Sequence, residues 1–171
     1  VALWGRDPGV MDEMRARRDN RRYLPGRRLG ASVEPTSEIA RAVGGCEMLV
    51  VAVPSASVRK VALLAGAHLR PGVTVLCASK GLEEESRATL DRVLAEAVPG
   101  SPVVLLSGPT FAQEIAGGLP AAAVVASRVP EAAGLAQLAL AGDRFRVYTT
   151  DDVTGVALGG ALKNVMAIAA G

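Results

Sequence analysis

The chain has few of the side chains that usually carry metal or thiol chemistry. Its 171 residues include one histidine and two cysteines, and aromatic residues make up only 3% of the sequence. Because His68, Cys46 and Cys77 are spread along the chain, they form no clustered set of metal ligands, and we predict no metal site. Both cysteines fall in or beside apolar runs, which favours buried free thiols over a disulfide.

An excess of charge of one sign is also missing. The formal net charge is +2, and arginine is concentrated in one cluster between Arg15 and Arg28. Tyr23 is the only aromatic residue in this cluster, so solvated surface charge is favoured over a nucleic-acid patch. The sequence shows no signal peptide and no long uninterrupted apolar segment. We therefore expect no membrane segment and a location in the cytoplasm.

Small apolar side chains are abundant, and they are arranged in alternating strand-like and helix-like segments. Hydrophobic residues make up 50% of the sequence. Strands are expected over residues 1–4, 48–53, 73–78, 103–107, 121–127 and 145–148. Helices are expected over residues 10–18, 35–44, 56–67, 83–97, 110–116 and 130–140, with a last helix at the C-terminal end. This alternation predicts an α/β protein with a doubly wound, mostly parallel sheet.

The last helix places a single lysine, Lys163, among small and aliphatic residues. In a helix, Gly155, Gly159 and Lys163 recur every four residues and share one face. Such a face would let a ligand or another backbone approach closely, with an amine at the end of the gap. A lysine in apolar surroundings exchanges protons near neutral pH. A lysine that merely extends from an amphipathic helix into solvent is the equal alternative.

Ligands of doubly wound sheets bind beyond the carboxyl ends of the strands, so the residues at those ends are candidates. The first expected strand is followed by Arg6 and Asp7. An arginine there suits the 2′-phosphate of NADP, whereas an acid suits the ribose hydroxyls of NAD. Asp7 followed by Pro8 and Gly9 is also an ordinary turn sequence, so this signal is weak by itself.

Two further strand ends carry candidate residues. Lys80 follows the strand at 73–78, where it would meet either a phosphate or plain solvent. Gly108 and Thr110 follow the strand at 103–107. Thr110 and Gln113 have the spacing of a capping box, so we expect a helix start whose amides face a ligand beside Gly108, or simple capping without a ligand.

These segments resemble the NAD(P)-dependent glycerol-3-phosphate dehydrogenases, in particular the bacterial type. The segment Leu-Ser-Gly-Pro-Thr-Phe-Ala at 106–112 is specific, as is the Gly-rich lysine segment at 155–165. Weaker matches spread along the chain in the family's order, at residues 3–8, 20–26, 52–55, 78–83 and 145–148.

The resemblance implies a Rossmann-type fold and a reversible hydride transfer. Dihydroxyacetone phosphate and NAD(P)H would give sn-glycerol 3-phosphate, which feeds glycerophospholipid synthesis. Lys163 resembles the family's catalytic lysine, and Lys80 resembles a second lysine that contacts both substrate and cofactor. The other matching positions are two substrate contacts, Gly108 and Thr110, and two cofactor contacts, Ala112 and Arg6. NADPH is the favoured cofactor, with NAD as the alternative.

Two pieces of the family pattern are missing from the chain. The family's first strand and glycine-rich turn would precede Val1, and its helical substrate domain would continue after Gly171. We therefore expect a fragment truncated at both ends, with a dinucleotide-binding domain at 1–150 and the start of a substrate domain at 151–171. The complete protein would bind a small phosphorylated substrate, and a homodimer is one assembly that the resemblance allows. A dehydrogenase of a different small hydroxyacid and a non-catalytic binding module stay open as alternatives.

Overall fold

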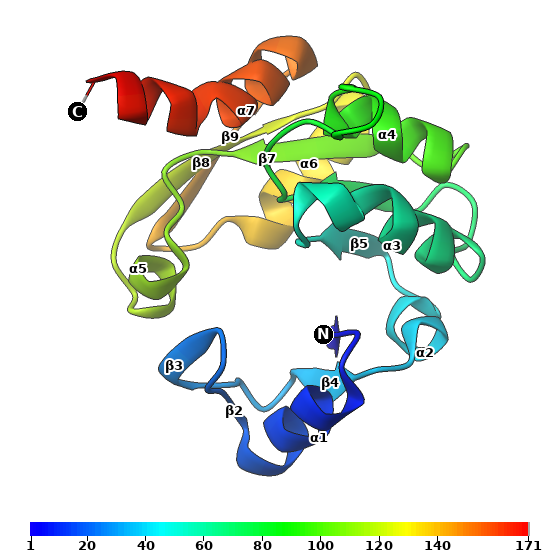
Figure 1. Cartoon of the computed structure of the whole chain (residues 1–171), viewed down its shortest axis with the longest axis vertical. Coiled ribbons are helices and arrows are strands. Elements are labelled where there is room, and N and C mark those ends of the chain that lie inside the picture. The colour runs from blue at the N-terminus through cyan, green and yellow to red at the C-terminus, as the bar shows by residue number, and fades with distance from the viewer. Residues whose placement is uncertain (171) are drawn as a thin grey trace.

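An open five-stranded sheet forms the middle layer of the larger part of the molecule (Figure 1). The computed structural model describes residues 1–170, and for residues 164–167 it describes the backbone alone. The strands lie in the order β5 (Met48–Val51), β6 (Thr74–Cys77), β7 (Val103–Ser107), β8 (Ala121–Ala126) and β9 (Phe145–Thr150). All neighbouring strands are parallel except β7 and β8, which are antiparallel. The predicted α/β, mostly parallel sheet is confirmed, with one reversal that the sequence did not reveal.

The central strands are buried on both faces, which explains their unbroken apolar runs. Every residue of β6 is buried, and Val75, Leu76 and Cys77 have no exposed surface. Strands of parallel sheets need apolar side chains on both sides because helices cover both faces. Strand β5 follows the same pattern less completely, since it lies at the edge of this sheet.

Helices cover the two faces unequally. One face carries α3 (Val58–Gly66), α4 (Leu90–Ala97) and α7 (Val153–Ala170), which form one apolar core with side chains of β5, β6 and β7. A short 3₁₀ turn, η1 (Ser55–Ser57), leads into α3. The other face carries α6 (Pro130–Leu140), whose alanines pack on Leu76, Val104 and Val125. None of the described helices is long and apolar enough to cross a bilayer.

The antiparallel pairing of β7 and β8 determines where α7 begins and in which direction it runs. Because β9 runs opposite to β7, the chain leaves β9 next to the amino end of β7, and Val153 lies beside Val103 there. Helix α7 then runs along β7, and Gly160 lies beside Ser107 at the strand's carboxyl end. The second half of α7 therefore reaches the edge of the sheet where parallel α/β proteins bind ligands.

Residues 1–45 form a smaller lobe. Strand β1 (Ala2–Trp4) pairs in parallel with β4 (Glu34–Thr36), and β2 (Asp19–Asn20) forms a hairpin with β3 (Leu24–Arg28). Two helices, α1 (Pro8–Arg17) and α2 (Ile39–Val43), complete the lobe.

Two predictions for this lobe are wrong. Residues 35 and 36 lie in β4 instead of starting a helix, and residues 24–26 lie in β3 instead of a plain loop. Pro35 is buried in β4, which pairs with β1 on one side only. A proline lacks an amide donor, so an edge strand of this kind accommodates it.

An apolar groove separates this lobe from the five-stranded sheet. It has a volume of about 680 Å³, and both β1 and β5 line it. Among the described residues, β1 pairs only with β4, and β5 pairs only with β6. Each strand therefore presents a backbone edge, and both edges border the same groove. Strands with open edges of this kind accept a further strand readily.

Replacing Leu94 with Ala tests the packing of the larger core. The Leu94 side chain has no exposed surface and lies between α4 and the sheet. We expect the free energy of unfolding of the complete protein to fall by about 2–5 kcal/mol, because the substitution leaves a cavity. Urea denaturation measures the loss. Leu138, which is 81% exposed on α6, is the matched control, and its replacement by Ala should change stability by no more than about 0.5 kcal/mol. Equal losses in both variants would contradict this placement of the core.

Candidate functional site

Lys80 lies on a short loop that begins at the carboxyl end of β6. The hydroxyl of Ser79 donates a hydrogen bond to the Val53 carbonyl (2.5 Å) and accepts one from the Val53 amide (3.1 Å). The next residue, Gly81, has a φ of +121°, and a Cβ there would lie 3.3 Å from the Ser55 side chain. The loop thus passes close to the end of β5, and its backbone favours glycine directly after the lysine.

The end of β7 forms the floor of the site. Gly108 has a φ of +150°, and a Cβ on it would lie 2.8 Å from the Ala122 carbonyl oxygen. Only glycine avoids both the strained backbone and this collision. The chain therefore turns away from β7 directly after Ser107, whose side chain faces α7.

Gly160 of α7 completes one wall of a narrow cleft. A Cβ on Gly160 would lie 3.4 Å from Ser107 Oγ and 3.9 Å from Lys80 Cγ. An alanine would fit there, but a longer side chain would enter the cleft. The cleft is lined by Lys80, Ser107 and Gly160 together with apolar residues of β7, α4 and α7.

The glycine face predicted for α7 is exposed. Gly155 and Gly159 are exposed, and a Cβ on Gly159 would meet nothing within 4 Å. At the start of the helix, the Gly155 amide donates a hydrogen bond to the Asp152 carboxylate at 2.8 Å. The glycine that faces the sheet is Gly160, three residues before Lys163.

Lys163 follows Gly160 by three residues on α7. It is exposed, so the predicted apolar surroundings are not found: Gly160 already lies beside the last residue of β7, and Lys163 follows one turn later. The Lys163 ammonium nitrogen lies 4.8 Å from the centroid of the Phe111 ring, within the range of a cation–π contact. The side chain of Asn164, which follows the lysine in the matching motif, lies outside the described residues.

The positive charge of Lys163 affects the pKa of Lys80. The pKa of Lys80 is lowered from its usual value of 10.5, first by partial burial and second by the positive charge of Lys163. Both causes disfavour the ammonium form of Lys80. Lys80 lines the cleft, and Lys163 lies near enough to lower the pKa of Lys80, so we call this site the two-lysine cleft. Such a pair attracts an anion, because an anion relieves the repulsion between the cations.

Thr110 and Ala112 lie on the turn after Gly108, but not as a capping box. Helix α5 (Ala112–Ala116) begins two residues after Thr110, and Phe111 occupies its N-cap position without a side-chain hydrogen bond. The Thr110 amide and hydroxyl both approach the Gly108 carbonyl, at 2.9 and 3.4 Å. The predicted capping box is therefore wrong, whereas the predicted contact of the helix amides with a ligand stays a prediction.

Arg6 belongs to the smaller lobe and does not line the two-lysine cleft. It is exposed in the turn between β1 and α1. Its neighbour Asp7 is already engaged: the Asp7 carboxylate accepts a hydrogen bond from the Val10 amide (3.3 Å) and pairs with Arg22 (3.6 Å). At this strand end, the arginine is the side chain that remains available to a ligand.

Sequence reasoning missed three residues of the site. Ser107 and Gly160 meet across the cleft, and Phe111 contacts the Lys163 ammonium. Phe111 carried a usable signal, because it is one of two phenylalanines in a chain poor in aromatic residues and it follows a strand end. Gly160 carried none, because Gly159 and Gly160 are adjacent and only the packing of α7 distinguishes them.

The fold and the position of the cleft define a class of protein. An open, mostly parallel sheet covered on both faces, with a site beyond the carboxyl ends of its strands, is the architecture of doubly wound dinucleotide-binding domains. Residues 1–133 match the family model described as the NAD-dependent glycerol-3-phosphate dehydrogenase N-terminus. The chain belongs to this family.

Individual relatives agree with the family match. The glycerol-3-phosphate dehydrogenase [NAD(P)+] of Desulfitobacterium hafniense (strain Y51) is 48% identical over 171 residues, which are 100% of this chain and 48% of that protein. The enzyme of the same name from Thiobacillus denitrificans is 46% identical over 173 residues, which are 100% of this chain and 52% of that protein. The chain thus spans about half the length of the curated relatives it matches.

Solved structures show the same fold. The crystal structure of glycerol-3-phosphate dehydrogenase from Coxiella burnetii superposes with a TM-score of 0.92 at 32% identity, over 98% of this chain and 51% of that one. A glycerol-3-phosphate dehydrogenase from Plasmodium falciparum gives a TM-score of 0.89 at 20% identity, over 98% of this chain and 48% of that one. The second likeness concerns the fold alone. The predicted family and the predicted Rossmann-type fold are both confirmed.

Proposed function

We propose that the complete protein interconverts dihydroxyacetone phosphate and sn-glycerol 3-phosphate by hydride transfer with NAD(P)H. The observation that carries the proposal is that Lys80 lines a cleft beyond the carboxyl ends of β6 and β7 and that the positive charge of Lys163 lies near it. A phosphorylated ketone suits this pair because it is an anion with a carbonyl that gains negative charge during reduction. The names of the relatives support the same reaction. The product would feed glycerophospholipid synthesis in the cytoplasm.

Lys163 supplies the proton in this proposal. When bound, the reduced nicotinamide supplies a hydride to the carbonyl carbon of the substrate. The Lys163 ammonium donates a proton to the carbonyl oxygen, which stabilises the alkoxide that forms as the carbon–oxygen double bond becomes single. In the oxidative direction the neutral amine accepts the hydroxyl proton. Its exposed position lets water restore the proton afterwards.

Lys80 and the turn after β7 bind the substrate in this proposal. Lys80 lines the cleft and is partly buried, and Gly108 lets the turn after β7 pass close to the backbone of β8. Thr110 supplies a hydroxyl on the same turn. Gly160 keeps the opposite wall free of a side chain, so the substrate approaches both amines.

The residues present fit part of a dinucleotide. Arg6 offers an exposed guanidinium at the end of β1, where it suits the 2′-phosphate of NADP, and Asp7 is engaged by α1 and Arg22. Ala112 begins α5 with a small exposed side chain that would allow close contact with the cofactor. Lys80 is placed to contact cofactor and substrate together.

We also propose that the groove between β1 and β5 receives one further parallel strand from residues outside this chain. Both strand edges line the groove, and its apolar walls suit a strand buried on both faces. The added strand would join β4, β1 and the five-stranded sheet into one, bringing the end of β1 and the end of β6 to a common edge. In this arrangement residues 1–150 form the dinucleotide-binding domain, and residues 151–171 begin the substrate domain.

Replacing Lys163 with Met in the complete protein tests its role. We expect turnover of dihydroxyacetone phosphate to fall by a factor on the order of a hundred or more, because both proton transfer and charge stabilisation are lost. Arginine should not restore activity, since its guanidinium does not release a proton in the working pH range. NADPH oxidation followed by absorbance gives the rates.

Lys60 provides the control, since it is an exposed lysine on α3 away from the cleft. The Lys60→Met enzyme should keep its turnover. Near-normal turnover in a folded Lys163→Met enzyme would contradict the assigned role. Equal use of unphosphorylated dihydroxyacetone by the wild type would favour a dehydrogenase of another small substrate.

Replacing Arg6 with Ala tests the choice of cofactor. We expect the KM for NADPH to rise by about tenfold or more and the KM for NADH to change much less, because only NADPH carries the phosphate that pairs with a guanidinium. Steady-state kinetics with both cofactors provide the comparison, and the NADH series is the internal control. Equal increases for the two cofactors would show that Arg6 does not read the phosphate.

A further inference from the structure

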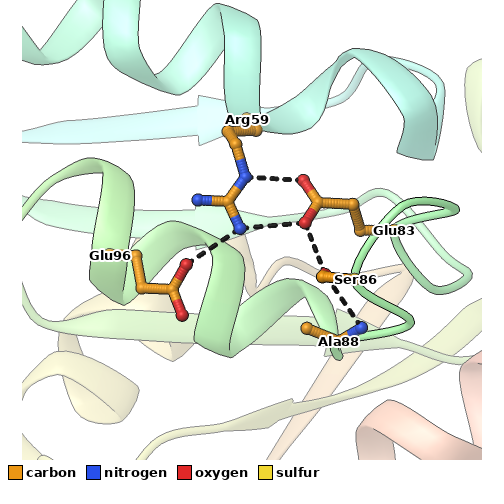
Figure 2. Close-up of polar contacts among 5 residues, drawn as sticks. All are labelled: Arg59, Glu83, Ser86, Ala88 and Glu96. Carbon is orange, nitrogen blue, oxygen red and sulfur yellow. Dashed lines mark hydrogen bonds and ion pairs between the residues drawn. The ribbon is translucent and has the colours of Figure 1, made fainter.

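An ion pair with two parallel hydrogen bonds joins α3 to the loop that follows Lys80 (Figure 2). Arg59 Nε donates to Glu83 Oε1 at 2.7 Å, and Arg59 Nη2 donates to Glu83 Oε2 at 2.8 Å. This fork-to-fork geometry fixes the orientation of both side chains as well as their distance. The pair lies outside the two-lysine cleft and has no part in the proposed proton transfer.

The Glu83 carboxylate is built into the loop. Its side chain is only 8% exposed, and the Ser86 hydroxyl donates a further hydrogen bond to Oε2 at 2.5 Å. Ser86 Oγ in turn accepts from the Ala88 amide at 3.1 Å, as Figure 2 shows. The Glu83 amide donates to the Ala88 carbonyl at 3.0 Å. Side chain and backbone of Glu83 therefore close residues 83–88 into one compact turn.

The charge of Glu83 is stable over the working pH range. Hydrogen bonds from Arg59 first and Ser86 second lower the pKa of Glu83 to about 2. Since the pKa of the folded state is lower than the usual 4.5, the pair stabilises the fold above that value and loses its effect as the pH falls toward 2. At neutral pH the Glu83 carboxylate is therefore ionised and able to pair with Arg59.

Lys80 lies between two fixed points. On one side, Ser79 is bound to Val53 at the end of β5 by two hydrogen bonds. On the other side, Glu83 is bound to Arg59 on α3. Only Lys80, Gly81 and Leu82 lie between them. A segment this short cannot shift while both ends are fixed, but release of one end frees its backbone.

We propose that Arg59 and Glu83 are positioning residues that hold the Lys80 amine in place at the cleft. The proposal rests on the proposed function, because it assigns to Lys80 a contact with the substrate. A misplacement of about 1 Å in a binding group is enough to lower catalysis by a large factor. The Arg59 guanidinium thus holds the loop of Lys80 in place through Glu83, without contacting the lysine itself.

Arg59 also supplies its own control. Its Nη2 atom lies 2.8 Å from Glu96 Oε2, so Glu83 and Glu96 share one guanidinium. Glu96 lies on α4, is 61% exposed, and links α3 to α4 without contacting the Lys80 loop. Glu96→Gln therefore removes an ion pair of the same arginine and leaves the loop attached.

Hydrogen–deuterium exchange of the complete protein tests the positioning without reference to activity. In Glu83→Gln and Arg59→Met, the amides of residues 78–83 should exchange about tenfold faster than in the wild type, because one fixed end is released. In Glu96→Gln the same amides should stay within about twofold, as expected for an exposed ion pair. Equal exchange in Glu83→Gln and Glu96→Gln would overturn the proposal.

A double-mutant cycle tests whether the effect passes through Lys80. Glu83→Gln alone should lower kcat/KM for dihydroxyacetone phosphate by about tenfold or more. In a Lys80→Met background it should lower kcat/KM no further, because the group that it positions is absent. A purely structural role would lower kcat/KM by the same factor in both backgrounds, and that result would overturn the proposal.

The two readouts separate the two proposals. If the wild type does not reduce dihydroxyacetone phosphate, the proposed function fails, and hydrogen exchange still decides whether the ion pair fixes the loop. If Glu83→Gln does not fold, Arg59→Lys replaces it, since lysine keeps the charge but not the two-point geometry. Faster exchange of residues 78–83 in Arg59→Lys supports the proposal, and wild-type exchange contradicts it.

Discussion

The close approach of α7 to the end of β7 is the constraint on which the site depends. Gly160 lies against Ser107 and Lys80 with room for a methyl group at most, so Lys163 follows within one helical turn of the cleft. The result is two lysines at one cleft, an arrangement that is unfavourable for an empty site because like charges repel. An anionic substrate removes this repulsion. Two neighbouring cations of this kind favour the binding of an anion, as the proposed function requires.

The arrangement of the sheet and the arrangement of charges support each other. The antiparallel pairing of β7 and β8 turns β9 around, and this reversal sends α7 back along β7 to the ligand-binding edge. On the opposite wall, Ser79 ties the Lys80 loop to β5, while Glu83 ties it to α3. Different contacts therefore position the two lysines: the packing of α7 positions Lys163, and the contacts of Ser79 and Glu83 position Lys80. A loss of packing under α7 and a loss of the Arg59 ion pair would disturb the same cleft from two sides.

The sequence predicted the long apolar elements well because their burial leaves a plain pattern. Strand β7 and helix α6 have the predicted bounds, since an unbroken run in one case and a proline start in the other mark them. Strand β4 escaped prediction because Glu34, Pro35 and Thr36 contain no apolar run, and its partner β1 lies far away in the sequence. The antiparallel direction of β8 was not predicted either, because an apolar run gives no information on the direction of its strand.

The candidate site was predicted in its residue types and less well in its geometry. Lys80 and Gly108 were predicted from their positions at strand ends, Lys163 from its place in a small-residue helix, and all three from the family resemblance. The contact of Gly160 with the sheet was not predicted, because only packing decides whether Gly159 or Gly160 faces the sheet. The roles assigned to Lys80, Gly108, Thr110, Lys163, Arg6 and Ala112 stay predictions. Glu83 was expected in a helix, and its contact with Arg59 joins two segments that no local pattern connects.

The central claim is that the amines of Lys80 and Lys163 share one cleft, and titration of Lys80 tests it most directly. Lysine side chains of the complete protein can be labelled by reductive ¹³C-methylation and their pKa values followed by NMR. The account predicts a pKa of Lys80 below the usual 10.5 in the wild type and a partial return toward that value in Lys163→Met. The return is partial because burial, the larger cause, remains. A Lys80 pKa that does not change when Lys163 is replaced would contradict the account.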